Sequence, residues 1–167
     1  LFGFNLKQNF ASPYFSRNIM EFWKRWHISL TSWLTDYIFT PLAIKYRHFG
    51  KVGIICSLVL TFLISGLWHG ANWTFIIWGA LHSVFFLITI LLTRGKTHKG
   101  VVAQNKNLPT IKEIWQMTTT FFLVCISYTF FRAESLGHAF EYINKIFSET
   151  LFLSPYYAGI GANKEVI

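Results

Sequence analysis

The chain has 167 residues, of which 53% are hydrophobic and only 13% are charged, against roughly 25% charged residues in soluble globular proteins. Aromatic residues make up 19% of the chain, and a soluble domain of this size could not bury so much apolar surface. The composition therefore excludes an ordinary soluble domain and predicts an integral membrane protein.

The formal net charge of +8 does not indicate nucleic-acid binding, because of where the charges lie. Lysine and arginine gather in short segments that flank apolar runs, at 17–25, 45–51 and 94–112. This distribution is typical of the cytoplasmic loops of a multi-pass membrane protein. We therefore expect a lipid bilayer as the partner of this surface, and no nucleic acid.

Residues 1–18 predict a loop that leads into a helix, since "NFASPYFSRN" contains a proline and several helix-capping residues. From 19 to 34, apolar residues recur at steps of three and four, which predicts one amphipathic helix. Its tryptophans stand beside basic residues. Such a helix suits the headgroup level of a bilayer, but it could equally pack against other helices.

Three membrane spans are expected, at 52–68, 73–92 and 113–131, each close to the roughly 20 residues that cross a bilayer. The loop at 93–112 has five basic residues and no acidic residue, which predicts a cytoplasmic location. The tail at 135–153 is again amphipathic. Together these elements predict an all-α, multi-span helical bundle. Because the chain begins with neither methionine nor a signal-peptide pattern, we expect it to be a piece of a longer protein.

The segment "SGLWHGANW" is the most polar part of the uncharged stretch between Lys51 and Arg94. A polar side chain in a bilayer is unfavourable unless it is paired or wetted, so His69 predicts a site. Asn72 is positioned to hold its imidazole or to replace lost backbone hydrogen bonds, and Gly66 and Gly70, four residues apart, would allow close helix packing. The alternative is an ordinary solvated turn between two spans.

Two more histidines belong to this region. His27 lies in the amphipathic segment, and His82 lies within the second span, where it is either a core histidine bonded to a neighbouring span or a member of a proton relay. The spacing of the three histidines matches no metal-binding motif, so no metal is expected. Acid–base chemistry fits better, because a neutral imidazole can accept the proton of a hydroxyl group as its oxygen attacks an activated acyl group.

Two long strings carry a family resemblance: "EFWKRWHISLTSWLTDYIFTPL" at 21–42 and "SGLWHGANWTFIIWGALHS" at 65–83. They resemble the membrane-bound O-acyltransferase family, and within it the bacterial alginate O-acetylation branch. The segments "NFASPYFSRNIMEFW" and "FFRAESLGHAF" are similar to the same branch. The resemblance extends from about residue 3 to residue 147.

The resemblance implies that residues 1–167 form the C-terminal part of a multi-helix enzyme with a tunnel through the bacterial cytoplasmic (inner) membrane. It implies that His69 is catalytic and that His27 is the second histidine of the tunnel. The acyl group, an acetyl in this branch, would come from a cytoplasmic thioester such as acetyl-CoA or an acyl carrier. The acceptor would be a hydroxyl of an exported polysaccharide, with periplasmic partner proteins assisting and no bound cofactor.

Four further residues are expected to support the site: Trp68, Asn72, Trp73 and Asp36. For Asp36 a charged partner such as Arg25 or a histidine is expected, although a plain helix-end role is equally compatible with its position. The sequence departs from the family pattern at Thr35, where an arginine is usual, and at "AIKYRHFGK", where a glycine pair is usual. These departures affect the acceptor and the partners rather than acyl transfer.

Other functions remain open at this stage. A D-alanyl transferase acting on teichoic acid shares the arrangement of two histidines. A proton-coupled transporter would use His69 and His82 as a relay and would carry successive acidic and basic groups within its spans. In a purely structural membrane subunit the histidines would be replaceable.

Overall fold

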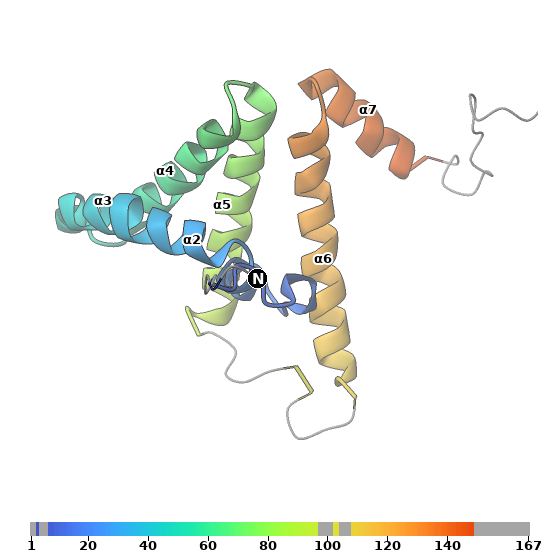
Figure 1. Ribbon diagram of the computed structural model, residues 1–167, viewed down its shortest axis with the longest axis horizontal. Coiled ribbons are helices and arrows are strands. Elements are labelled where there is room, and N and C mark those ends of the chain that lie inside the picture. Colours follow the sequence, from blue (N-terminus) through green and yellow to red (C-terminus); the bar gives the residue numbers. More distant parts are fainter. Residues whose placement is uncertain (1–2, 4–6, 97–101, 104–107, 149–167) are drawn as a thin grey trace, which may run out of the picture.

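The computed structural model describes residue 3 and residues 7–96, 102–103 and 108–148. Within these residues the secondary structure is entirely helical (Figure 1). The elements in chain order are η1 Pro13–Phe15, α1 Ile19–Arg25, α2 Ile28–Leu34, η2 Thr35–Phe39, α3 Thr40–Lys45, η3 Arg47–Phe49, α4 Lys51–His69, α5 Trp73–Thr93, α6 Ile111–Arg132 and α7 Leu136–Ile146.

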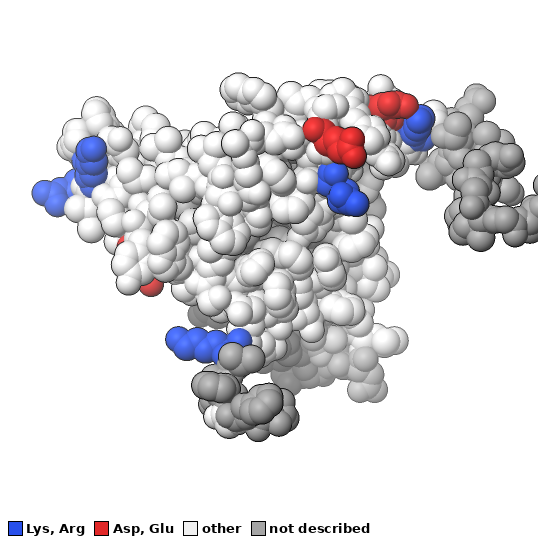
Figure 2. Space-filling view, turned by 45° about the horizontal axis from the view of Figure 1, so that its top comes forward, with Lys and Arg blue, Asp and Glu red and all other residues white. Residues whose placement is uncertain are grey.

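Helices α4, α5 and α6 have 19, 21 and 22 residues and are long and apolar enough to cross a membrane. At about 1.5 Å per residue each is roughly 30 Å long, the thickness of a bilayer's hydrocarbon core. Their bounds agree within two residues with the predicted spans, so the all-α membrane fold is confirmed. The face displayed in Figure 2 is largely uncharged, with basic and acidic side chains toward its margins.

The ends of the long helices define two sides of the molecule. In Figure 1 the turn between α4 and α5 and the junction between α6 and α7 lie at one end, and the end of α5 and the start of α6 lie at the other. His69, the last residue of α4, therefore lies at the end opposite to Arg94 and Lys112, which are described residues of the basic segment 93–112. Residues 97–101 and 104–107 of that segment lie outside the described residues, as do residues 1–2 and 4–6 of the leading loop and 149–153 of the predicted tail.

Helices α4 and α5 pack with their backbones in direct contact. A Cβ atom on Gly66 would clash with the carbonyl oxygen of Phe75, and one on Gly79 would clash with that of Phe62. The two glycines therefore allow an approach that a larger residue would prevent. The close packing expected at Gly66 is present against the backbone of Phe75, whereas Gly70 lies beyond the end of α4; Gly79 on α5 makes a second close approach, against the backbone of Phe62.

The single helix expected over 19–34 is interrupted. Helix α1 ends at Arg25, and α2 begins at Ile28 after a residue with positive φ, His27 (φ 47°, ψ 50°). The hydrophobic periodicity continues across this break, which is why the sequence pattern did not reveal it. This helix packs against its neighbours, because four of its residues are buried: Ile19, Met20, Phe22 and Trp23.

Beyond the break the chain changes direction and packs along α4. Helix α2 continues through a π-helical turn, η2, into α3, and in Figure 1 these elements run across the direction of α5. The core is formed where α1, α5, α6 and α7 meet. It contains Ile19, Phe22, Trp23, Trp78, Val124, Phe130, Ala133 and Ala139.

Candidate functional site

His69 is the last residue of α4 and is enclosed by aromatic rings. The ring of Phe131 stands edge-on to the imidazole with a centroid distance of 4.8 Å, and those of Trp68 and Trp78 do the same at 4.9 and 5.3 Å. The ring of Phe75 lies at 6.1 Å. Within the described part of the chain the imidazole of His69 makes no hydrogen bond. Its two nitrogens are therefore available to a substrate.

The turn after His69 is held by Asn72. The Asn72 Oδ1 atom accepts a hydrogen bond from the backbone N–H of Thr74 at 3.2 Å and so caps the start of α5. Its Nδ2 atom donates to the carbonyl oxygen of Glu134 at 3.1 Å. Of the two roles expected for Asn72, the structure thus shows the backbone role, and no hydrogen bond joins it to His69.

His27 occupies a backbone conformation that is uncommon for a residue other than glycine. Hydrogen bonds on both sides hold it there: Ala11 donates its N–H to the carbonyl of Arg25, and Ile28 donates its N–H to the carbonyl of Asn9, each at 2.9 Å. The Asn9 side chain also accepts a hydrogen bond from the backbone N–H of Ser29. Strained residues fixed in this way are often found at functional sites.

The structure brings His27 and His69 into the same region. A chain of ring contacts connects them: His27 with Trp26 at 6.1 Å, Trp26 with Tyr128 at 5.9 Å, Tyr128 with Phe131 at 6.1 Å, and Phe131 with His69. Residues 42 positions apart in the sequence thus share one aromatic cluster.

The other expected site residues lie at the surface. The side chains of Trp68 and Trp73 flank the His69 turn and are 64% and 69% exposed. Asp36 is exposed on η2, and among the residues that the structure describes it has no hydrogen-bond or ion-pair partner. The partner suggested for it, Arg25, instead forms an ion pair with Glu21 at 2.6 Å. The geometry therefore leaves Asp36 apart from the histidines.

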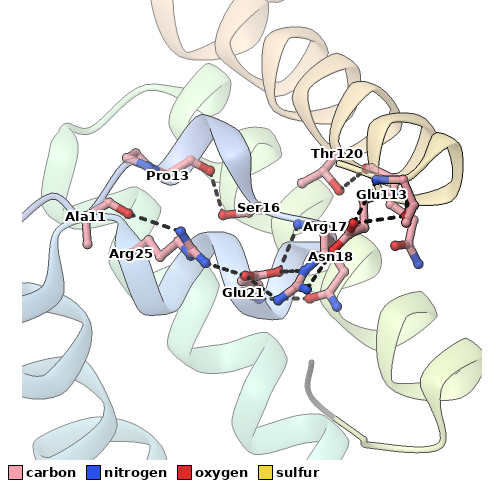
Figure 3. A network of polar contacts seen from close by, with 11 residues as sticks. Ala11, Pro13, Ser16, Arg17, Asn18, Glu21, Arg25, Glu113 and Thr120 are labelled. Atoms are coloured by element: carbon pink, nitrogen blue, oxygen red, sulfur yellow. Dashed lines mark hydrogen bonds and ion pairs between the residues drawn. The ribbon is translucent and has the colours of Figure 1, made fainter. Parts of the chain in front are cut away.

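A buried ionic network that the sequence did not reveal fixes α1 against α6 (Figure 3). Arg17 pairs with Glu21 at 3.1 Å and with Glu113 at 3.3 Å, and Arg25 pairs with the other oxygen of Glu21. Burial opposes ionisation of Glu21, but the hydrogen bonds and charge of Arg17 outweigh it and lower the pKa of this carboxyl. The hydrogen bond to Glu21 raises the pKa of Arg17.

Glu113 begins α6 as part of a capping box, exchanging hydrogen bonds with Thr110. It is the one carboxylate within α4, α5 and α6, and it lies in the first turn of α6. No succession of acidic groups along the spans, as expected of a proton-coupled transporter, is present in these three helices. In the described ranges there is also no group of three or more histidine, cysteine or acidic residues placed to hold a metal.

His82 is a core histidine with partners on two other helices. It is 1% exposed, its Nδ1 atom lies 3.3 Å from the indole nitrogen of Trp23, and its Nε2 atom lies 2.9 Å from the hydroxyl of Ser127. The interpretation of His82 as a core residue bonded to a neighbouring span is confirmed. Because both nitrogens are engaged, the relay expected of a transporter lacks a free site here.

These features define a class of protein: a helical membrane protein with an unbonded histidine at the end of one span and a second, backbone-strained histidine close by. The sequence model of the membrane-bound O-acyltransferase family matches residues 1–131. The chain therefore belongs to the membrane-bound O-acyltransferase family.

Relatives with described functions agree with this family. A Pseudomonas aeruginosa protein described as "Probable alginate O-acetylase AlgI" is 41% identical over 148 residues, which cover 89% of this chain and 26% of the relative. A Helicobacter pylori peptidoglycan O-acetyltransferase is 39% identical, covering 84% of this chain and 25% of the relative. A Bacillus subtilis teichoic acid D-alanyltransferase is 31% identical, covering 83% and 35%. The chain thus spans between a quarter and about a third of the length of these relatives.

Proposed function

We propose that this chain carries the catalytic histidine of an O-acyltransferase that moves an acetyl group from an activated thioester to a hydroxyl of an exported polysaccharide. The family and the relatives named for alginate and peptidoglycan acetylation support this assignment. The bacterial cytoplasmic membrane is the proposed location, with the spans α4, α5 and α6 crossing it. The single observation that carries the chemistry is the imidazole of His69, which is enclosed by aromatic rings and lacks a hydrogen bond to any described residue.

In the proposed reaction His69 acts as a general base. Its neutral imidazole accepts the proton of the acceptor hydroxyl while the hydroxyl oxygen forms a bond to the thioester carbonyl carbon. The carbon–sulfur bond then breaks, and the proton passes from the imidazolium to the departing thiolate, which leaves as a free thiol. The rings of Phe75, Trp78 and Phe131 pack around the imidazole and shield part of it from water, whereas the ring of Trp68 is exposed beside it.

His27 is proposed to support the same reaction from the other side of the aromatic cluster. Its strained backbone is held by Asn9 and Ala11, so its imidazole is kept in one place near His69. Trp68 and Trp73 are proposed to line the approach of substrates, because their rings are exposed beside His69. Asp36 is proposed to make no contact with either histidine, because its side chain is exposed on η2.

The sidedness of the fold supports opposite locations for donor and acceptor. The basic segment 93–112 indicates a cytoplasmic end, and the His69 turn lies at the other end of the long helices (Figure 1). We propose that a cytoplasmic thioester reaches His69 through the membrane and that the polysaccharide meets it from outside. Periplasmic partner proteins would then bind near the His69 end.

The test is to replace His69 by alanine in the protein in its own membranes and to measure ester-linked acetate on the exported polysaccharide. Loss of a general base predicts a decrease of at least a hundredfold at normal protein level. The matched control is His138→Ala, which removes a histidine from α7 without touching the aromatic cluster. Unchanged acetylation in His69→Ala would contradict the proposal and leave a structural role for this turn.

D-alanyl transfer to teichoic acid is the second candidate, because the Bacillus subtilis relative is 31% identical over 145 residues. The two functions differ in the group transferred and not in the proposed use of His69. If the wild type forms ester-linked D-alanine in place of ester-linked acetate, and if this ester disappears in His69→Ala, the chain has this second function.

A further inference from the structure

His82 has a hydrogen-bond partner for each ring nitrogen, and the partners specify one protonation state. The indole nitrogen of Trp23 is only a donor, so the Nδ1 atom of His82 accepts from it. Ser127 donates its hydroxyl proton to the carbonyl of Val124 at 2.7 Å, so its oxygen accepts from the Nε2–H of His82. The network therefore fits the neutral imidazole protonated on Nε2, and a second ring proton would face the N–H of Trp23.

The two partners belong to helices that position the two site histidines. Trp23 lies on α1, four residues before His27, and the ring of Trp26 stacks on Phe22 at the end of the same helix. Ser127 lies on α6, one turn before Phe131, whose ring packs on His69. His82 on α5 therefore connects the helix that leads to His27 with the helix that packs against His69.

A third contact links His82 to His69 along α5 itself. The ring of Trp78, one turn earlier, packs edge-on against His82 at 4.9 Å and against His69 at 5.3 Å. Trp78 is 3% exposed, so it has little freedom to move independently of these neighbours. A displacement of the His82 ring would therefore reach His69 through one intervening side chain.

We propose that His82 is a positioning residue for the acyl transfer. In its neutral form it joins α1, α5 and α6 in the middle of the membrane and thereby sets the placement of His27 relative to His69. His82 neither accepts nor donates a proton during the reaction. This inference rests on the proposed function for its kinetic consequence, but the placement of the two imidazoles can be tested without it.

The kinetic test compares His82→Asn with His82→Leu in the protein in its own membranes. Asparagine can place an amide oxygen near the position of Nδ1 and accept the hydrogen bond of Trp23, whereas leucine cannot. We expect His82→Leu to lower kcat at least tenfold with little change in KM for the donor, and His82→Asn to recover at least a third of the wild-type kcat. An equal and complete loss in both variants would indicate a proton carrier and overturn the proposal, as would full activity in His82→Leu.

The structural test measures the ¹⁵N resonances of protein labelled at its histidines. The resonances are assigned with variants that each lack one histidine. At neutral pH, His82 should show a protonated Nε2 and an unprotonated Nδ1, and His82→Leu should shift the resonances of both His27 and His69. Ser83→Ala is the matched control, because Ser83 is buried beside His82 but bonds only to the carbonyl of Ala80 in its own helix. Unmoved resonances of His27 and His69 in His82→Leu would refute the positioning role, even if the wild-type protein transferred no acyl group. Absence of wild-type transfer would refute only the proposed function.

Discussion

The side chain of Asn72 joins the turn that follows His69 to the segment that follows α6. Its Nδ2 atom donates a hydrogen bond to the carbonyl of Glu134 at 3.1 Å, while its Oδ1 atom caps α5. Two loops separated by 62 positions are therefore fixed together at the same end of the long helices. This bond holds the end of α6, and with it Phe131, beside the imidazole of His69.

Asn72→Asp should separate the two roles of this residue. Aspartate keeps an oxygen that caps α5, but it cannot donate to Glu134. We expect a loss of about 1 kcal/mol in stability and a several-fold decrease in acyl transfer, whereas Asn72→Ala also loses the cap and about 1 kcal/mol more. Thermal unfolding in detergent and ester formation in membranes provide the two measurements. Equal stability and equal acyl transfer in Asn72→Asp and the wild type would show that the bond to Glu134 contributes to neither.

At the crossing of α4 and α5, Gly79→Ala should destabilise the protein by about 1–3 kcal/mol, because the added Cβ would overlap the carbonyl oxygen of Phe62. The matched control is Gly137→Ala in α7, where the nearest atom to an added Cβ is the Ser135 hydroxyl at 4.0 Å. That control should be neutral or stabilising by about 0.5–1 kcal/mol, as expected for glycine replaced within a helix. Unfolding in detergent measures both, and a neutral Gly79→Ala would contradict the close crossing.

At the helix break, His27→Gly and His27→Ala should differ in stability. Both remove the imidazole, but glycine adopts the positive φ of this position freely, whereas alanine retains a penalty of about 1 kcal/mol. We expect both variants to lose acyl transfer to a similar extent, with His27→Gly the more stable of the two in a thermal melt. A wild-type rate in His27→Gly would restrict His27 to a structural role.

The ionic network of α1 predicts sensitivity to acid. The pKa of Glu21 is lowered in the folded protein, so its stabilising contribution is present above its ordinary pKa of about 4.3 and is lost as the pH falls through the lower, folded-state value. Glu21→Gln should lose about 3 kcal/mol at neutral pH, since Arg17 and Arg25 lose their shared partner.

The measurement is a series of thermal melts between pH 7 and pH 3. The wild type should lose more stability than Glu21→Gln over this range, because only the wild type has a carboxylate at this position to protonate. The control is Glu141→Gln, which removes the partner of an exposed ion pair on α7 and should change stability only slightly. Parallel melting curves for the wild type and Glu21→Gln would show that the network does not stabilise α1.

The sequence by itself determined the spans and the family. Hydrophobic runs of about 20 residues require helices in a bilayer, because every backbone polar group must be bonded within its own segment there. The position of His69 at the end of such a run made it a candidate site residue, with an ordinary turn as the alternative. The strings around His27 and His69 also identified the family.

Only the tertiary structure decided how these residues meet. The break at His27 depends on two backbone hydrogen bonds, from Ile28 N–H to the Asn9 carbonyl and from Ala11 N–H to the Arg25 carbonyl, which no local periodicity records. The pairing of Arg17 with Glu113 depends on the position of α1 beside α6. The neutral state of His82 follows from Trp23 and Ser127, which are 59 and 45 positions away. Such contacts are set by the packing of helices from distant parts of the chain, and a single sequence does not state which helices will be neighbours.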